Sequence, residues 1–152
     1  MKKREFKKEK GYDFDLYVWK KRVDTDIGVF KVELQVNRKE SITEQMLAIL
    51  ANLIEVGTSN IGQIRGLIHQ SYKDACTNDP GWVEDICGIP LNLKEGEVIR
   101  RVTNLCFTIA SDSTTPEGFD SYVHIIPPWD EEHAIFLRNE KSGFLRFDPM
   151  DA

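Results

Sequence analysis

The fold is decided by an alternating stretch over residues 29–36, which reads Val29-Phe30-Lys31-Val32-Glu33-Leu34-Gln35-Val36. Successive side chains of a β-strand point to opposite faces, so this stretch predicts a strand with its apolar residues on one face. The segment from Asp13 to Trp19 alternates in the same way and places Phe14, Leu16 and Val18 together. Asp24 to Gly28 is typical of a turn. We therefore expect a hairpin with one covered face and one face in water.

A first helix is predicted directly after this hairpin. Ser41-Ile42-Thr43-Glu44 is a capping-box pattern in which Ser41 caps the helix. Gly57 is the expected left-handed cap at the other end. Between them, apolar residues recur at helical spacing, namely Met46, Ile49, Leu50, Leu53 and Ile54.

A second helix is predicted by a further apolar stripe, which consists of Ile61, Ile64, Ile68, Tyr72 and Ala75. We expect Ser59 or Asn60 to cap its start. Asn78-Asp79-Pro80-Gly81 should end it, because Pro cannot continue a helix and a Pro-Gly step is typical of a turn. The short link from Gly57 to Asn60 predicts two neighbouring helices, as in an antiparallel helical hairpin.

The second half of the chain returns to strands after a stretch from Trp82 to Arg101 to which the sequence assigns no role. Within that stretch, residues 94–101 predict a short helix. Pro127-Pro128 should stop the pairing of the strand before it, and residues 139–143 should connect a C-terminal hairpin. The strand over residues 134–137 is apolar throughout, which predicts burial on both faces. The predicted strands are Leu105–Ile109, Tyr122–Ile126, Ala134–Leu137 and Phe144–Phe147.

These patterns together predict an α+β fold in which a helix pair packs on one face of a mostly antiparallel sheet. The chain has 152 residues, is 41% hydrophobic and carries a net charge of −5, which suits one globular domain. We expect that domain to span residues 11–152, after a basic flexible arm over residues 1–10.

The composition also limits the cellular setting. No apolar run approaches the roughly 20 residues that cross a bilayer, and no secretory signal is visible, so we expect a cytoplasmic protein without membrane contact. The odd cysteine count, made up of Cys76, Cys87 and Cys106, predicts buried thiols in a reducing compartment.

The densest chemistry lies in the run Trp129-Asp130-Glu131-Glu132-His133. In an extended segment, Asp130 and Glu132 would face one way, and the other three residues would face the opposite way. A structural role fits this run. Trp129 would pack under the helices with its N–H satisfied, and Asp130 would cap backbone N–H groups after the prolines. His133 would hold Glu132 or a backbone carbonyl.

Two catalytic alternatives use the same residues. In the first, Asp130, Glu132 and His133 bind zinc, manganese or iron, and His124 joins them from the adjacent strand. In the second, Glu132 and His133 act as acid and base in hydrolysis. The sequence contains no nucleotide fingerprint, phosphate loop or paired-histidine spacing, so we expect no cofactor and no resident metal.

The motif also carries a resemblance. The end of the chain resembles a bacterial family of uncharacterised domains marked by Trp-Asp-x-Glu-His before a C-terminal hairpin, here Trp129 to His133. Thr43-Glu44-Gln45 and Tyr72 look like the same family. The sequence departs from it at Ala134, where a glycine is common, and at Pro127-Pro128. The resemblance implies small accessory proteins of the kind linked to toxin immunity, with no established activity.

Three functions remain open at this point. The first is a protein-binding module, in an immunity or accessory role, whose acidic surface (pI near 5.3) recognises a basic toxin-like partner. The second is the hydrolytic enzyme described above. The third is a structural subunit that pairs sheet edges. We expect no nucleic-acid binding, because no Lys/Arg stripe with interleaved aromatic residues appears along the sequence.

Overall fold

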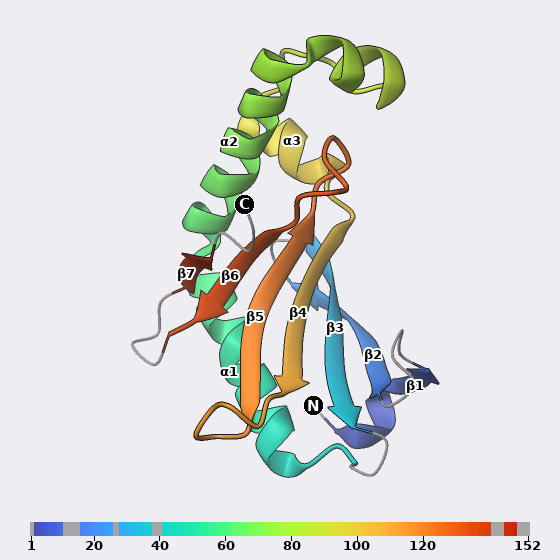
Figure 1. The fold of residues 1–152 in the computed structure, drawn as a ribbon, viewed down its shortest axis with the longest axis vertical. Helices are drawn as coiled ribbons and strands as arrows, with labels where there is room; N and C mark the ends of the chain where they lie inside the picture. Colours follow the sequence, from blue (N-terminus) through green and yellow to red (C-terminus); the bar gives the residue numbers. More distant parts are fainter. Residues whose placement is uncertain (1, 11–15, 26–27, 38–40, 141–144, 149–152) are drawn as a thin grey trace.

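The protein folds into two layers, a seven-stranded sheet and a set of helices on one of its faces (Figure 1). The structure is a computed structural model that describes residues 2–10, 16–25, 28–37, 41–140 and 145–148. The strands are β1 (Lys7–Lys10), β2 (Leu16–Thr25), β3 (Gly28–Asn37), β4 (Asn104–Ser111), β5 (Phe119–Ile126), β6 (Ile135–Asn139) and β7 (Leu145–Asp148). The helices are α1 (Glu44–Ser59), α2 (Ile61–Asn78) and α3 (Glu95–Arg101), with short turns of helix η1 (Lys3–Glu5) and η2 (Trp82–Ile86).

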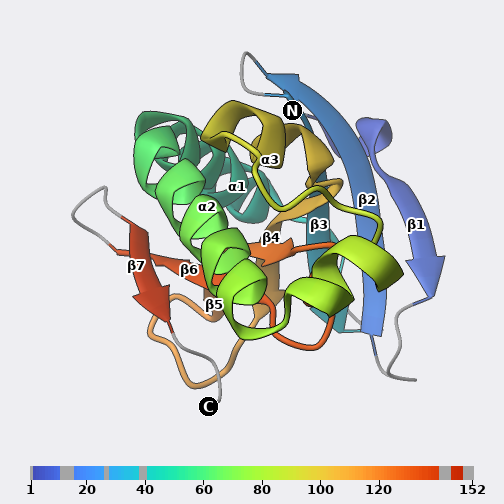
Figure 2. The ribbon, with the colours of Figure 1, turned by 90° about the horizontal axis from the view of Figure 1, so that it is seen from above.

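The strands lie in the sheet in the order in which they occur in the chain. Every neighbouring pair is antiparallel except β3 and β4, which are parallel. A parallel pair needs a long crossover, and all three α-helices lie in the one between β3 and β4. Seen from above, the sheet curves around these helices (Figure 2). The predicted α+β class with a mostly antiparallel sheet is confirmed.

The alternating stretch that predicts the sheet behaves as expected. Its four apolar residues are buried against the helices, and they are Phe30, Val32, Leu34 and Val36. The hairpin turn is narrower than predicted, because Thr25 pairs with Gly28 and the strands continue up to both residues. The predicted start of the first strand, including Phe14, lies outside the described residues.

The start of α1 differs from the prediction. Thr43, not Ser41, caps the helix, and its hydroxyl accepts a hydrogen bond from the Met46 backbone N–H at 3.2 Å. The helix begins at Glu44, so the third helical position is occupied by Met46, which has no carboxylate to complete a capping box. Ser41 and Thr43 are both hydroxyl residues suited to this role, and Ile42 between them is buried against the core.

Gly57 is not a helix cap. It lies inside α1, and the positive-φ glycines among the described residues are Gly88 and Gly118. A Cβ atom at Gly57 would stand 2.5 Å from Cε1 of Phe107 on β4. The glycine therefore allows the end of α1 to pack directly on the Phe107 ring.

The two long helices do not form an antiparallel hairpin. A single residue, Asn60, separates them, and its N–H donates to the carbonyls of Val56 and Gly57 while its own carbonyl accepts from Ile64. Helical hydrogen bonding thus continues through the junction. As a result, α2 runs on past α1 instead of turning back alongside it (Figure 1). The predicted stripe of α2 is confirmed, with Ile64, Ile68 and Tyr72 buried.

The helix α2 ends at Asn78 as predicted, but Pro80-Gly81 does not form the predicted turn. Asp79 caps a new helical segment, because its carboxylate accepts from the Trp82 N–H at 3.0 Å. Pro80 and Gly81 then begin that segment, which continues as a π-helix, η2. Proline is well suited to the first position of a helix, where its missing N–H has no partner to lose. The short helix predicted over residues 94–101 is confirmed as α3.

Three further expectations need correction. Part of the predicted N-terminal arm belongs to the domain, since β1 pairs with β2 and Phe6 is buried in the core. Strand β6 is covered on one face only, and its Phe136 is half-buried on the other. Of the cysteines, Cys106 is buried, whereas Cys76 and Cys87 are partly exposed. No helix in the described part of the chain is long and apolar enough to span a membrane.

Candidate functional site

The motif Trp129 to His133 lies in the loop that joins β5 to β6, and it folds as two successive turns. In the first, the Asp130 N–H donates to the Pro127 carbonyl at 3.1 Å. In the second, the Asp130 carboxylate accepts from the His133 N–H at 3.2 Å. The motif is therefore not an extended segment, and the alternation of faces that an extended segment would impose does not apply. Pro127-Pro128 stops the pairing as expected, and the turns bring Asp130 and His133 together.

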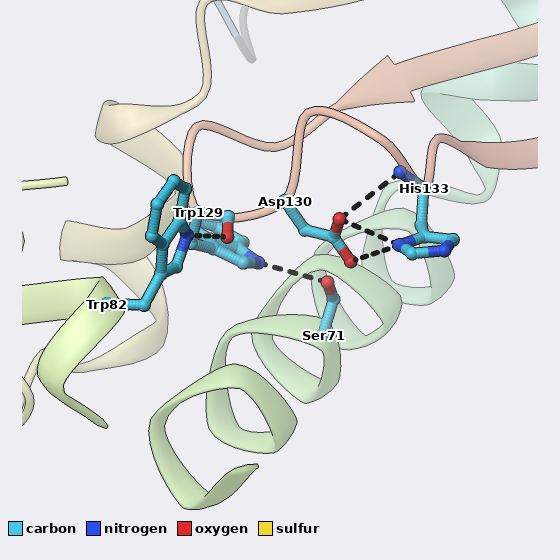
Figure 3. A network of polar contacts seen from close by, with 5 residues as sticks. All are labelled: Ser71, Trp82, Trp129, Asp130 and His133. Carbon is cyan, nitrogen blue, oxygen red and sulfur yellow. Dashed lines mark hydrogen bonds and ion pairs between the residues drawn. The ribbon is translucent and has the colours of Figure 1, made fainter. Parts of the chain in front are cut away.

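Trp129 is the buried anchor of this loop, with 2% of its surface exposed. Its indole N–H donates to the Ser71 hydroxyl on α2 at 3.0 Å (Figure 3). Its ring meets the Tyr72 ring edge-on, with 5.4 Å between centroids. Its backbone carbonyl accepts from the Trp82 indole N–H at 3.0 Å (Figure 3). The packing of Trp129 under the helices with its N–H satisfied is as predicted.

Asp130 and His133 form the exposed part of the motif. The Nδ1 atom of His133 lies 2.9 Å and 3.1 Å from the two carboxylate oxygens of Asp130 (Figure 3). The His133 side chain is 70% exposed and the Asp130 side chain 38% exposed. Solvent therefore screens the attraction between them, and the pair adds little to the stability of the fold. Asp130 caps the turn as predicted, but His133 binds Asp130 and not Glu132. The pair fixes the orientation of the imidazole at the surface.

Of the four residues considered for a metal, Asp130 and His133 are in contact, whereas His124 and Glu132 do not join them in a cluster. His124 lies on β5, with its ring stacked on Phe136 at 4.8 Å, and burial lowers the pKa of its imidazole. Glu132 is exposed on the loop. Within the residues that the structure describes, no group of three or more His, Cys, Asp or Glu side chains is placed to hold a metal ion.

Two hollows flank the Asp130–His133 pair, and we call them together the acidic groove. One, of about 450 Å³, lies between α2 and the start of β6 and reaches Phe147 of β7. The other, of about 860 Å³, lies between the end of α2, η2 and the β5–β6 loop. No lysine or arginine is among the described residues that line the two hollows. Five carboxylate residues line them, namely Asp74, Asp79, Asp130, Glu131 and Glu132.

Large apolar side chains also open into the acidic groove. Trp82 is 48% exposed, Ile86 67% and Phe147 46%, and they are the exposed large hydrophobic residues of the described chain. Trp82 and Ile86 line the larger hollow and Phe147 the smaller one. Sequence reasoning missed all three, because they come from η2 and β7, which are more than 50 residues apart. The available signal was the i, i+4 spacing of Trp82 and Ile86 around the buried Val83.

The one thiol in the groove is poorly suited to nucleophilic attack. Burial, together with the nearby carboxylates of Glu131 and Asp79, raises the pKa of the Cys87 thiol. A thiol must lose its proton to attack, so these neighbours oppose its activation. The Ser71 hydroxyl is engaged by the Trp129 N–H. The groove therefore places an oriented imidazole beside carboxylates and apolar side chains, without an activated nucleophile among the described residues.

Comparison of the chain with protein-family models, with curated proteins and with solved structures gives no match.

Proposed function

We propose that this protein is a binding module for another protein, and that the acidic groove receives a basic segment of that partner which carries large apolar side chains. One observation carries the proposal. All of the exposed large hydrophobic side chains in the described chain, Trp82, Ile86 and Phe147, line the same groove. Exposed apolar side chains that gather in one place, rimmed by polar groups, are typical of an interaction surface.

The charge around these side chains supports a basic partner. No lysine or arginine among the described residues that line the groove balances its five carboxylate residues. A field of one sign in a concave surface steers oppositely charged partners toward it and rejects partners of the same charge. The net charge of −5 acts in the same direction.

Trp82 is held in place before a partner arrives. Its N–H is bonded to the Trp129 carbonyl, and Trp129 is itself bonded to Ser71. A fixed aromatic side chain loses little conformational freedom on binding, which makes it an effective anchor. The π-helical backbone of η2, a rare geometry that often occurs at functional sites, presents both Trp82 and Ile86.

The family resemblance of Trp129 to His133 adds an immunity or accessory role in bacteria to this proposal, with a basic toxin-like protein as the partner. This role is tested by co-expressing the chain with a basic protein encoded beside its gene. We expect the two proteins to purify together, and we expect the Ile86→Ser variant of this chain to lose the partner. Separate elution of the two proteins at low salt contradicts the role.

A peptide selection tests the groove itself. We expect random 12-residue peptides selected on the full-length protein to be enriched in Lys or Arg together with Trp, Phe or Leu. The selected peptides should bind the Ile86→Ser variant at least about tenfold more weakly, since buried apolar anchors dominate such interfaces. Ile86 is largely exposed, so the variant should fold normally. Selected peptides that are acidic, or that bind the variant as tightly as the wild type, contradict the proposal.

A charge-reversal pair gives the matched control. Glu131→Lys and Glu132→Lys change the groove, whereas Glu44→Lys and Glu95→Lys make the same change at exposed positions of α1 and α3. We expect the first pair to weaken peptide binding and the second pair to leave it within about twofold. Equal weakening by both pairs would mean that the total charge, and not the groove, governs binding.

The enzyme alternative is favoured by one observation, the Asp130–His133 pair. A carboxylate that orients an exposed imidazole is a common arrangement for a general base. If hydrolysis is the function, His133→Gln abolishes turnover of ester or phosphoester substrates by the purified protein.

The oligomer alternative has less support. The edge strand β1 is four residues long and reads Lys-Lys-Glu-Lys, and short charged edge strands oppose pairing with another sheet.

A further inference from the structure

The face of the sheet opposite the helices combines cations with aromatic rings. Buried residues such as Val32, Phe107 and Val123 point toward the helices, so their neighbours in each strand point to the other side, which we call the open face. The three α-helices α1, α2 and α3 pack on the concave face of the sheet, and the open face is the convex face on the other side (Figure 2). The open face was not visible in the sequence, because its residues are scattered over six strands.

Cations occupy both ends of the open face. Strand pairing places Lys7 beside Lys20, Arg22 beside Lys31, and Arg138 beside Arg146. The carboxylates beside these cations, among the described side chains, are Glu33, Asp120 and Glu140. Asp120 is paired with Arg138 and Glu140 with Arg146 at 3.5 Å, so the excess of positive charge lies on β1 to β3. The open face is therefore basic although the chain is acidic overall, and the opposite charge is concentrated in the acidic groove.

Aromatic rings lie between the two groups of cations. His124 and Phe136 are stacked, with 4.8 Å between ring centroids and 13° between planes. The Tyr122 ring lies 5.7 Å from Phe136, and the guanidinium carbon of Arg138 stands 6.0 Å from the centre of the Tyr122 ring. All three rings are half-buried, so part of each remains accessible. Burial lowers the pKa of His124, which keeps its ring neutral near pH 7.

We propose that the open face binds single-stranded nucleic acid, with bases stacked on Tyr122, His124 and Phe136 and phosphates on the flanking lysines and arginines. Sequence-tolerant binding of single strands combines a basic track with aromatic rings on which bases stack. Seven strands about 4.8 Å apart span roughly 29 Å, which is enough for several nucleotides. An acidic protein segment would form ion pairs with the cations, but it carries no bases to stack on the aromatic rings.

This inference replaces the expectation from the sequence that the chain binds no nucleic acid. That expectation depended on the lack of a basic and aromatic stripe along the chain, whereas the sheet assembles one across its strands. The inference is independent of the proposed protein-binding role, because the open face and the acidic groove share no residue. Loss of one activity therefore leaves the other measurable.

The test measures anisotropy of fluorescein-labelled dT12 and rU12 with the full-length protein at pH 7 and 50 mM salt. We expect saturable binding that weakens steeply with salt. Arg22→Glu with Lys31→Glu, both exposed on the open face, should weaken binding about tenfold or more. Lys73→Glu with Arg100→Glu makes the same charge change at exposed positions of α2 and α3 and should have an effect below about threefold.

The aromatic rings are tested separately. His124→Leu and Tyr122→Leu should each weaken binding about fivefold or more at constant salt dependence, because stacking is lost while the phosphate contacts remain. Melting curves check that these variants fold. No saturable binding at 50 mM salt overturns the proposal, as does equal weakening by the two charge-reversal pairs. Displacement of the oligonucleotide by poly-glutamate at equal charge concentration also overturns it, in favour of an acidic protein partner.

Discussion

The Trp129 indole N–H donates to the Ser71 hydroxyl at 3.0 Å, and this contact fastens the β5–β6 loop to the middle of α2. The two residues are 58 positions apart in the chain. The same loop carries Asp130 and His133 into the acidic groove, and the Trp129 carbonyl holds Trp82 at its rim. The motif thus shapes the groove through its buried residue and lines it with its exposed ones.

Ser71→Ala tests this connection. The substitution leaves the buried Trp129 N–H without its acceptor, and we expect the free energy of unfolding to fall by about 1–3 kcal/mol. Thr77→Ala removes an exposed hydroxyl from the same helix and should change it by less than about 0.5 kcal/mol. Urea unfolding measures both. Equal effects of the two substitutions would show that the hydrogen bond is not needed.

Gly57→Ala tests the packing of α1 on the sheet. The new Cβ atom would overlap the Phe107 ring, which is buried and held edge-on by Phe30 at 5.3 Å, so we expect a loss of about 1–3 kcal/mol. Gly62→Ala in α2 meets nothing within 4 Å and should instead gain about 0.5–1 kcal/mol from helix propensity. The opposite signs are checked by thermal or urea unfolding, and stabilisation by both substitutions contradicts the close contact.

The position of Gly57 shows what the sequence can and cannot predict about this fold. Alternating or apolar runs predicted β2 to β7 but not β1, and helical spacing predicted α1 and α2, because these signals follow directly from the backbone geometry. A glycine near a helix end fits either a left-handed cap or a close approach. Only the position of Phe107, fifty residues further along, distinguishes the two. The same limit applies to Asn60, whose local sequence suits a hairpin and a continued helix equally.

The sequence predicted only those parts of the candidate site that depend on local residue patterns. The burial of Trp129 and the capping by Asp130 followed from residue type and the preceding prolines. The Asp130–His133 contact did not, because it requires the second turn. The acidic groove is assembled from α2, η2, the β5–β6 loop and β7, so no local pattern contains it. Tertiary placement alone brings Phe147 near the same loop as Ile86.

The stability of the fold should depend on pH through His124. Burial lowers the pKa of His124 below its unfolded value of about 6.5, so the unfolded chain binds the extra proton more readily. The resulting stability is present above pH 6.5 and is lost as pH falls toward the lowered folded pKa. We expect His124→Gln to flatten this slope in urea unfolding between pH 7 and pH 5. His133→Gln is the matched control. An unchanged slope in the His124 variant contradicts this account.

Cys106 should be chemically silent in the folded protein. Burial raises the pKa of its thiol to about 12, so almost no thiolate is present at pH 8. In a Cys76→Ser, Cys87→Ser double variant, we expect DTNB to label the remaining thiol only after denaturant is added. Rapid labelling under native conditions would show that the thiol is accessible.

The proposed function depends most on the acidic groove as the site that receives a protein partner. The most direct measurement is a map of backbone amide chemical-shift changes in the ¹⁵N-labelled full-length protein as a selected basic and aromatic peptide is added. We expect the changes to concentrate at Trp82, Ile86, Asp130 to His133 and Phe147. Changes confined to the open face of the sheet or to the far end of α1, with the groove unaffected, would contradict it.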